Sequence, residues 1–179
     1  LRGELARAEK LLLAVQEQFP RLEGGYSNLV NVYVAEADKW LAQNSQDAAR
    51  QTLSKALAVL ERQAKAQSDQ AGIWIRHGGI CMTMADWSRA ISSLGRALEL
   101  EPDSQDARLN RALAALQAGQ DELARQDYCR VLGVNAAAFP AYYGLAELAW
   151  RRKDWQQAVA NYELYLKHAP RGTAEYAKV

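Results

Sequence analysis

Apolar residues recur along the chain at intervals of three and four, the spacing that places side chains on one face of an α-helix. Between residues 71 and 172 this pattern repeats with a period of 34 residues. Each period predicts two helices joined by a short turn, as at 74–85 and 87–100. The columns that carry the period are Ala90, Ala124 and Ala158; Leu98, Leu132 and Leu166; and Gly78, Ala112 and Ala146.

Particular residues in each period predict the turn between the two helices. Gly119 stands where the chain would enter a left-handed conformation, which glycine adopts without steric cost. Ala85 and Lys153 occupy the same column in the neighbouring periods, so the sequence predicts a turn at both that is either tighter or slightly strained. Asp154 then lies where its carboxylate can cap the helix that follows.

Composition narrows the class of protein further. Ala and Leu far outnumber Val, Ile and Thr, which favours helices over a large sheet. The net charge is +1 and is spread evenly, so we expect no binding to nucleic acid through its phosphates. We expect a soluble chain, because no apolar run is long enough to span a membrane and charged residues interrupt any signal peptide at Leu1. Two cysteines make no disulfide framework.

These residues resemble the tetratricopeptide repeat family. The residues that carry the resemblance are Trp74, Gly78, Ala90, Leu94, Ala97 and Pro102, and then Tyr142, Leu145, Ala146, Ala158, Tyr162 and Pro170. The resemblance implies an all-α fold, a right-handed α-solenoid of antiparallel helix hairpins that winds into a superhelix. Proteins of this family are scaffolds for protein–protein interaction.

The resemblance divides the chain into regular repeats and altered ones. Residues 71–104, 105–138 and 139–172 match well, and residues 23–70 form a longer version with seven additional residues in each helix. Seven residues are nearly two helical turns, about 10 Å, so we expect a projecting hairpin. Trp40 and Leu41 would lie near its tip, the turn would fall at 44–47, and 65–70 would be the return.

Both ends of the chain read as partial repeats. Residues 1–22 match the second helix of a repeat, and residues 173–179 match the start of a further helix. We therefore expect a single solenoid over 1–179 that is a fragment of a longer protein. Its exposed repeat ends would allow self-association.

A search for catalytic chemistry finds no enzyme signature, no metal site and no cofactor site. His77 and His168 are the two histidines, and we interpret the first as a packing residue and the second as a cation at a helix end. One alternative stays open, because His77 and Cys81 lie four residues apart and could form a reactive thiolate. The basic residues at 151–153 read as a solvated helix end, or otherwise as a contact for an acidic partner.

A function in binding a protein partner is better supported by the sequence than a catalytic function. In tetratricopeptide proteins the first helix of each repeat lines a concave groove, so the resemblance implies a groove for a peptide or helix of a protein partner. Its residues in this sequence would be Asn31, Ile75, Met82, Leu109, Leu113, Leu116, Tyr143, Glu147, Trp150 and Arg151. The alternative function is a structural spacer or docking region of a larger assembly, export or enzyme-bearing protein.

Overall fold

The computed structural model describes residues 2–19 and 22–170, and all regular structure within these ranges is α-helical. The predicted all-α class is confirmed. None of the described helices is long and apolar enough to cross a membrane. The further helix predicted at 173–179 lies outside the described residues. The helices are α1 (Arg2–Gln18), α2 (Glu23–Ala42), α3 (Gln46–Ala66), α4 (Ala71–Thr83), α5 (Trp87–Leu100), α6 (Gln105–Gln117), α7 (Asp121–Val134), α8 (Phe139–Arg151) and α9 (Trp155–His168).

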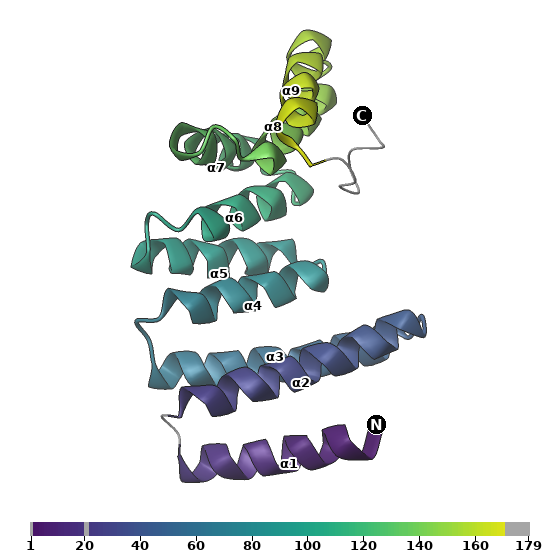
Figure 1. The fold of residues 1–179 in the computed structure, drawn as a ribbon, viewed down its shortest axis with the longest axis vertical. Helices are drawn as coiled ribbons and strands as arrows, with labels where there is room; N and C mark the ends of the chain where they lie inside the picture. The colour runs from purple at the N-terminus through teal and green to yellow at the C-terminus, as the bar shows by residue number, and fades with distance from the viewer. Residues whose placement is uncertain (1, 20–21, 171–179) are drawn as a thin grey trace. The chain divides into compact units, whose positions relative to one another are not determined.

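The helices form two compact units, residues 1–86 and 87–179. In the N-terminal unit each helix from α1 to α4 packs against the next, and the same holds from α5 to α9 in the C-terminal unit (Figure 1). In the C-terminal unit α6 also contacts α8, as expected for stacked hairpins. The boundary between the units falls inside the repeat predicted at 71–104, so the division of the chain into repeats stays a prediction.

Two helices of the N-terminal unit are longer than the others. α2 has 20 residues and α3 has 21, against 13 or 14 for each helix from α4 to α9. They lie side by side along their length (Figure 1). The turn occupies 43–45, slightly earlier than predicted, and Gln46 and Asp47 open α3. The carboxylate of Asp47 suits that place because it complements the helix dipole.

The small residues of the period lie in the core. Ala90, Ala124 and Ala158 are buried almost completely. A larger side chain at these positions would hold the packed helices apart. The core of the C-terminal unit is formed by Ala112, Ala115, Leu116, Ala124, Tyr128, Val131, Ala141 and Leu148.

The predicted left-handed turns are present at all three positions. The backbone φ angle is 55° at Ala85, 73° at Gly119 and 60° at Lys153. Asp154 caps α9, because its side chain accepts a hydrogen bond of 3.1 Å from the Gln157 amide. Gly119 has no Cβ and adopts this backbone conformation without a clash, whereas the Cβ atoms of Ala85 and Lys153 make the same conformation strained.

Replacing Lys153 with glycine should therefore stabilise the protein. We expect the free energy of unfolding to rise by up to about 1 kcal/mol, because the steric cost of a left-handed residue outweighs the additional freedom of glycine in the unfolded chain. Urea denaturation followed by circular dichroism measures this change. Lys153→Ala is the matched control, since it removes the same charge but keeps the Cβ. Equal stabilities for the two variants would contradict the prediction.

Candidate functional site

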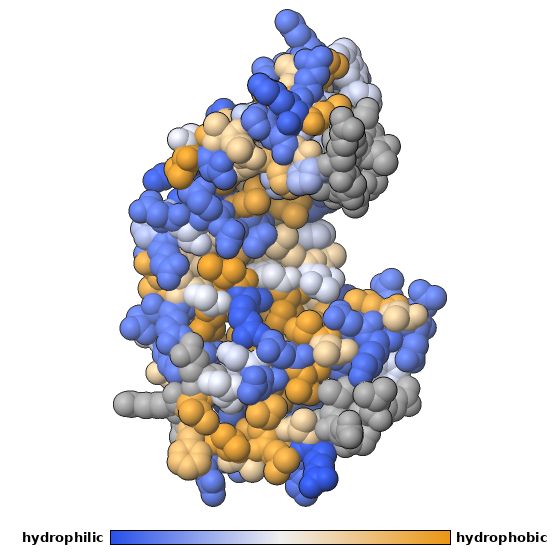
Figure 2. Space-filling view, in the orientation of Figure 1, coloured by the Kyte–Doolittle hydropathy of each residue, from blue (hydrophilic) through white to orange (hydrophobic). Residues whose placement is uncertain are grey.

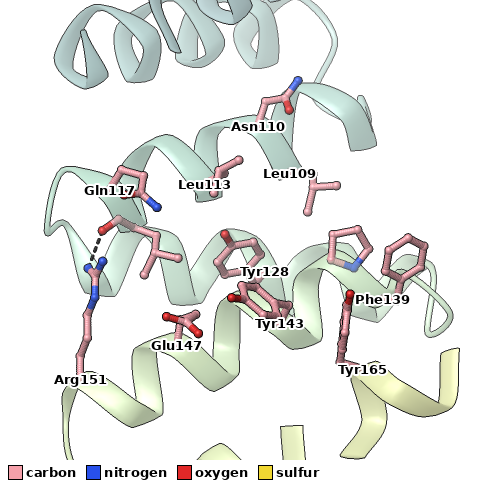
Figure 3. Close-up of a pocket in the computed structure, with 12 residues that line it drawn as sticks. Leu109, Asn110, Leu113, Gln117, Tyr128, Phe139, Tyr143, Glu147, Arg151 and Tyr165 are labelled. Carbon is pink, nitrogen blue, oxygen red and sulfur yellow. Dashed lines mark hydrogen bonds between the residues drawn. The ribbon is translucent and has the colours of Figure 1, made fainter. Parts of the chain in front are cut away.

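A pocket of about 380 Å³ opens in the C-terminal unit, and residues of four helices line it (Figure 3). α6 and α8 supply most of the lining, and α7 and α9 supply one aromatic residue each. The lining residues are Leu109, Asn110, Leu113, Leu116, Gln117, Tyr128, Phe139, Pro140, Tyr143, Glu147, Arg151 and Tyr165.

The middle of the pocket is apolar and aromatic. Leu109 points from α6 toward the rings below it, whereas Asn110 points away from them (Figure 3). On the opposite wall the ring of Tyr143 meets that of Tyr165 edge-on, with 5.4 Å between the ring centroids. Leu113 is 40% exposed and lines the cavity. Large apolar side chains that remain accessible in this way are typical of binding surfaces.

Tyr128 forms part of the pocket floor, and its position depends on Gly144. A Cβ atom at residue 144 would lie 2.2 Å from Cζ of the Tyr128 ring. The ring thus fills the space between α7 and α8. Tyr128 is almost completely buried, and this burial raises the pKa of its hydroxyl above the ordinary value.

The polar end of the pocket is already organised by contacts within the protein. The Tyr162 hydroxyl donates a hydrogen bond of 2.6 Å to the Glu147 carboxylate. Burial and this carboxylate both raise the pKa of Tyr162. Arg151 donates from Nη1 to the Leu116 carbonyl oxygen at 2.6 Å and lies 3.8 Å from Asp121 Oδ1. These contacts fix Glu147 and Arg151 at the edge of the apolar surface.

The basic residues at 151–153, where α8 ends, are exposed to solvent, as their interpretation as a solvated helix end requires. Arg151 and Arg152 each have a nitrogen 3.8 Å from a carboxylate oxygen of Asp121. Asp121 begins α7, so these ion pairs join the end of α8 to the start of the preceding helix.

The pocket brings together six of the ten residues predicted for the groove: Leu109, Leu113, Leu116, Tyr143, Glu147 and Arg151. Trp150 does not line it; its side chain is 56% exposed and its ring packs edge-on against Trp155. Asn31, Ile75 and Met82 belong to the N-terminal unit. There the Asn31 side chain accepts a hydrogen bond of 2.7 Å from Arg76.

Sequence reasoning missed the other six lining residues. Phe139 and Pro140 precede Tyr143 by four and three residues, the spacing of one helix face. This spacing could have predicted that they lie beside Tyr143. Tyr128 and Tyr165 come from α7 and α9, the second helices of their hairpins, which the groove prediction did not include. Asn110 and Gln117 complete the set.

The two histidines have packing partners. His168 stacks on Tyr142 with 5.7 Å between the ring centroids, at the end of α9. His77 is buried, and its Nδ1 lies 3.6 Å from Sγ of the completely buried Cys81. On its other side, Nε2 of His77 lies 3.7 Å from Oε1 of Glu61. Among the described residues there is no group of three or more His, Cys, Asp or Glu side chains that could hold a metal ion.

The burial of Cys81 predicts different reactivities for the two thiols. Iodoacetamide should modify the exposed Cys129 rapidly and leave Cys81 unmodified in the folded protein, because a thiolate must be accessible to react. Intact-mass spectrometry of Cys129→Ser reports on Cys81 alone. We expect no added mass until urea unfolds the chain. Rapid modification of the folded variant would instead support the thiolate activated by His77.

Comparison with known proteins agrees with this architecture. Residues 140–171 match the family described as "Tetratricopeptide repeat". The solved structure of MamA is 16% identical, with a TM-score of 0.67, and the match covers 93% of this chain and 90% of MamA. YrrB, "a TPR protein with an unusual peptide-binding site", is 17% identical, with a TM-score of 0.74 and coverage of 95% and 80%. A tetratricopeptide repeat protein from Parabacteroides merdae is 21% identical, with a TM-score of 0.72 and coverage of 96% and 62%.

No curated protein matches the sequence. At identities this low the solved structures show the fold alone, and the fold is the α-solenoid of helix hairpins that the sequence predicts. The family match identifies one tetratricopeptide repeat, at residues 140–171, and the rest of the chain is similar in fold to tetratricopeptide repeat proteins. The family match at 140–171 agrees with the expected general role as a scaffold for protein–protein interaction.

Proposed function

We propose that the pocket of the C-terminal unit binds a peptide or a helix of a protein partner, and that the chain acts without catalysis. The observation that carries this proposal is an accessible apolar and aromatic surface whose charged edge is already paired within the protein. Leu109, Leu113 and Tyr143 would anchor apolar side chains of the ligand. Aromatic and aliphatic anchors in a pocket commonly supply most of the affinity of such a complex.

The edge of the pocket would orient the ligand. Glu147 and Arg151 have opposite charges and stand four residues apart on α8, so they form a dipolar rim beside the apolar surface. An amphipathic peptide presents the matching arrangement, with apolar residues on one side and polar residues on the other. YrrB, which has a similar fold, is described as having a peptide-binding site, and we extend that property to this chain.

Selection from a random 12-residue peptide library displayed on phage tests the proposal. Peptides selected on the unmodified protein should be enriched in apolar and aromatic residues. Leu113→Glu should weaken their binding about tenfold or more, because it places a charge where an apolar side chain would be buried. Fluorescence anisotropy with the selected peptides measures the change. Leu113 is partly exposed, so this substitution spares the core.

Val159→Glu is the matched control. Val159 is an exposed apolar residue of α9 that does not line the pocket. Binding should survive this change. Peptides that bind all three proteins equally would contradict a role of the pocket, and a selection without enrichment would favour the structural spacer.

A further inference from the structure

Glu147 places a carboxylate beside the apolar middle of the pocket in the C-terminal unit. Its side chain lines the pocket and is half-buried. The Tyr162 hydroxyl donates a hydrogen bond of 2.6 Å to Oε1 of Glu147, and no described residue donates to Oε2. Because Tyr162 is a neutral donor, this hydrogen bond orients the carboxylate without cancelling its negative charge.

Arg151, one turn further along α8, does not neutralise this carboxylate. Its Nη1 donates to the Leu116 carbonyl oxygen at 2.6 Å and lies 3.8 Å from Asp121 Oδ1. Figure 3 shows the Arg151 side chain extended toward α6, whereas the Glu147 carboxylate faces the space between α8 and α6. Within residues 2–19 and 22–170 no lysine, arginine or histidine forms an ion pair with Glu147. A cation of a ligand would therefore meet a carboxylate without a counter-ion.

The surroundings of Glu147 suit a cation on an aliphatic stem. Tyr143 precedes Glu147 by one turn of α8, and its ring meets that of Tyr162 edge-on, with 6.0 Å between the ring centroids. Aromatic rings attract a cation that lies over their faces. On the opposite wall Leu113 is accessible, and Figure 2 shows hydrophobic residues exposed among hydrophilic ones where α6 meets α8. From Leu113 to Glu147 the pocket thus changes from apolar to aromatic to acidic.

Lysine and arginine have the complementary order of groups, since their methylene stems pack on apolar surface while the charged head stays in a polar environment. We propose that the peptide bound in this pocket carries one such basic residue. Its stem packs on Leu113 and Tyr143, and its head donates a charge-assisted hydrogen bond to Glu147. This inference rests on the proposed function and specifies a residue that the peptide must contain. A purely apolar peptide would desolvate Glu147 without pairing it, so the pocket selects against such peptides.

The peptides selected from the phage library test this inference. We expect lysine or arginine to recur at one position, beside apolar residues. The peptide that binds most tightly is then synthesised with a neutral counterpart at that position, citrulline for arginine or acetyl-lysine for lysine. Its dissociation constant, measured by fluorescence anisotropy, should rise about tenfold or more, because hydrogen bonds to charged groups are among the stronger ones.

Glu147→Gln identifies the partner of the basic residue. This variant keeps the shape of the side chain and can still accept the hydrogen bond from Tyr162, so we expect it to fold, which circular dichroism checks. The charged and neutral peptides should bind it with equal affinity, since the comparison isolates the pairing of the two charges. Glu163→Gln is the matched control, because Glu163 has the same charge but is exposed on α9 and does not line the pocket. This control should keep the difference between the two peptides.

The outcomes separate this inference from the proposed function. Selected peptides without a recurrent basic residue would overturn the inference, although the pocket would remain a peptide site. A preference for the charged peptide that persists in Glu147→Gln, or that is also lost in Glu163→Gln, would overturn it as well, since the ligand would then not pair with Glu147. A selection without enrichment contradicts the proposed function, and the inference fails with it.

Discussion

Replacing Asp127 with asparagine should lower the free energy of unfolding by about 3 to 5 kcal/mol, the cost of removing one partner from a buried ion pair. Asp127 is 3% exposed, and its carboxylate accepts two hydrogen bonds from Arg111, of 2.7 and 2.8 Å. Nη1 of the buried Arg108 lies 3.6 Å from the same carboxylate. The substitution keeps the shape of the side chain but leaves two guanidinium groups without their counter-ion.

Urea denaturation at neutral pH measures this loss. Glu122→Gln is the matched control, because Glu122 accepts hydrogen bonds from Arg125 and Gln126 that hold its pKa at about 2, yet lies on the surface. Water screens that pair, so we expect no measurable change. Adding Arg111→Met to Asp127→Asn should restore part of the stability. Similar losses for Asp127→Asn and Glu122→Gln would show that burial does not strengthen the interaction.

The period of the sequence predicts the helices because the same small and large residues must meet at each hairpin. Ala124 illustrates this, since it is completely buried, as its column in the period predicts. The ion pair of Arg111 and Asp127 could not be predicted in the same way. Charged residues on a helix usually face solvent, and nothing in the spacing of 16 residues indicates that α6 and α7 turn these two toward each other.

Part of the candidate site could be predicted from the period as well. Residues on the first helices of the hairpins follow from their offsets within the repeat, and Leu109 and Tyr143 do line one pocket. The depth of that pocket depends on how rings of different helices pack, as Tyr143 does against Tyr165. Such contacts depend on three-dimensional packing and produce no repeating pattern in the sequence. The burial of Gln16, which is only 6% exposed, could not be predicted either, because a glutamine on a helix is ordinarily solvated.

The second large effect is expected for Gly144→Ala. A glycine in a helix normally gains up to about 1 kcal/mol of stability when alanine replaces it. Here the new Cβ would lie 2.2 Å from Cζ of Tyr128, a ring that is almost completely buried. Overpacking of this kind costs about 1 to 3 kcal/mol, so we expect a net loss of stability. Gly79→Ala in α4 is the control, since no atom lies within 4 Å of its Cβ, and it should be neutral or stabilising.

A double-mutant cycle identifies the cause, because it isolates the interaction between residues 128 and 144. In a Tyr128→Leu background the space is open, and Gly144→Ala should no longer destabilise the protein. The same loss in both backgrounds would mean that the ring is not what the new methyl group meets. Tyr128 also lines the pocket, so a displaced ring in Gly144→Ala should change the affinity of selected peptides, although residue 144 does not line the pocket. The stability of the α7–α8 contact and the shape of the binding surface would then depend on the same glycine.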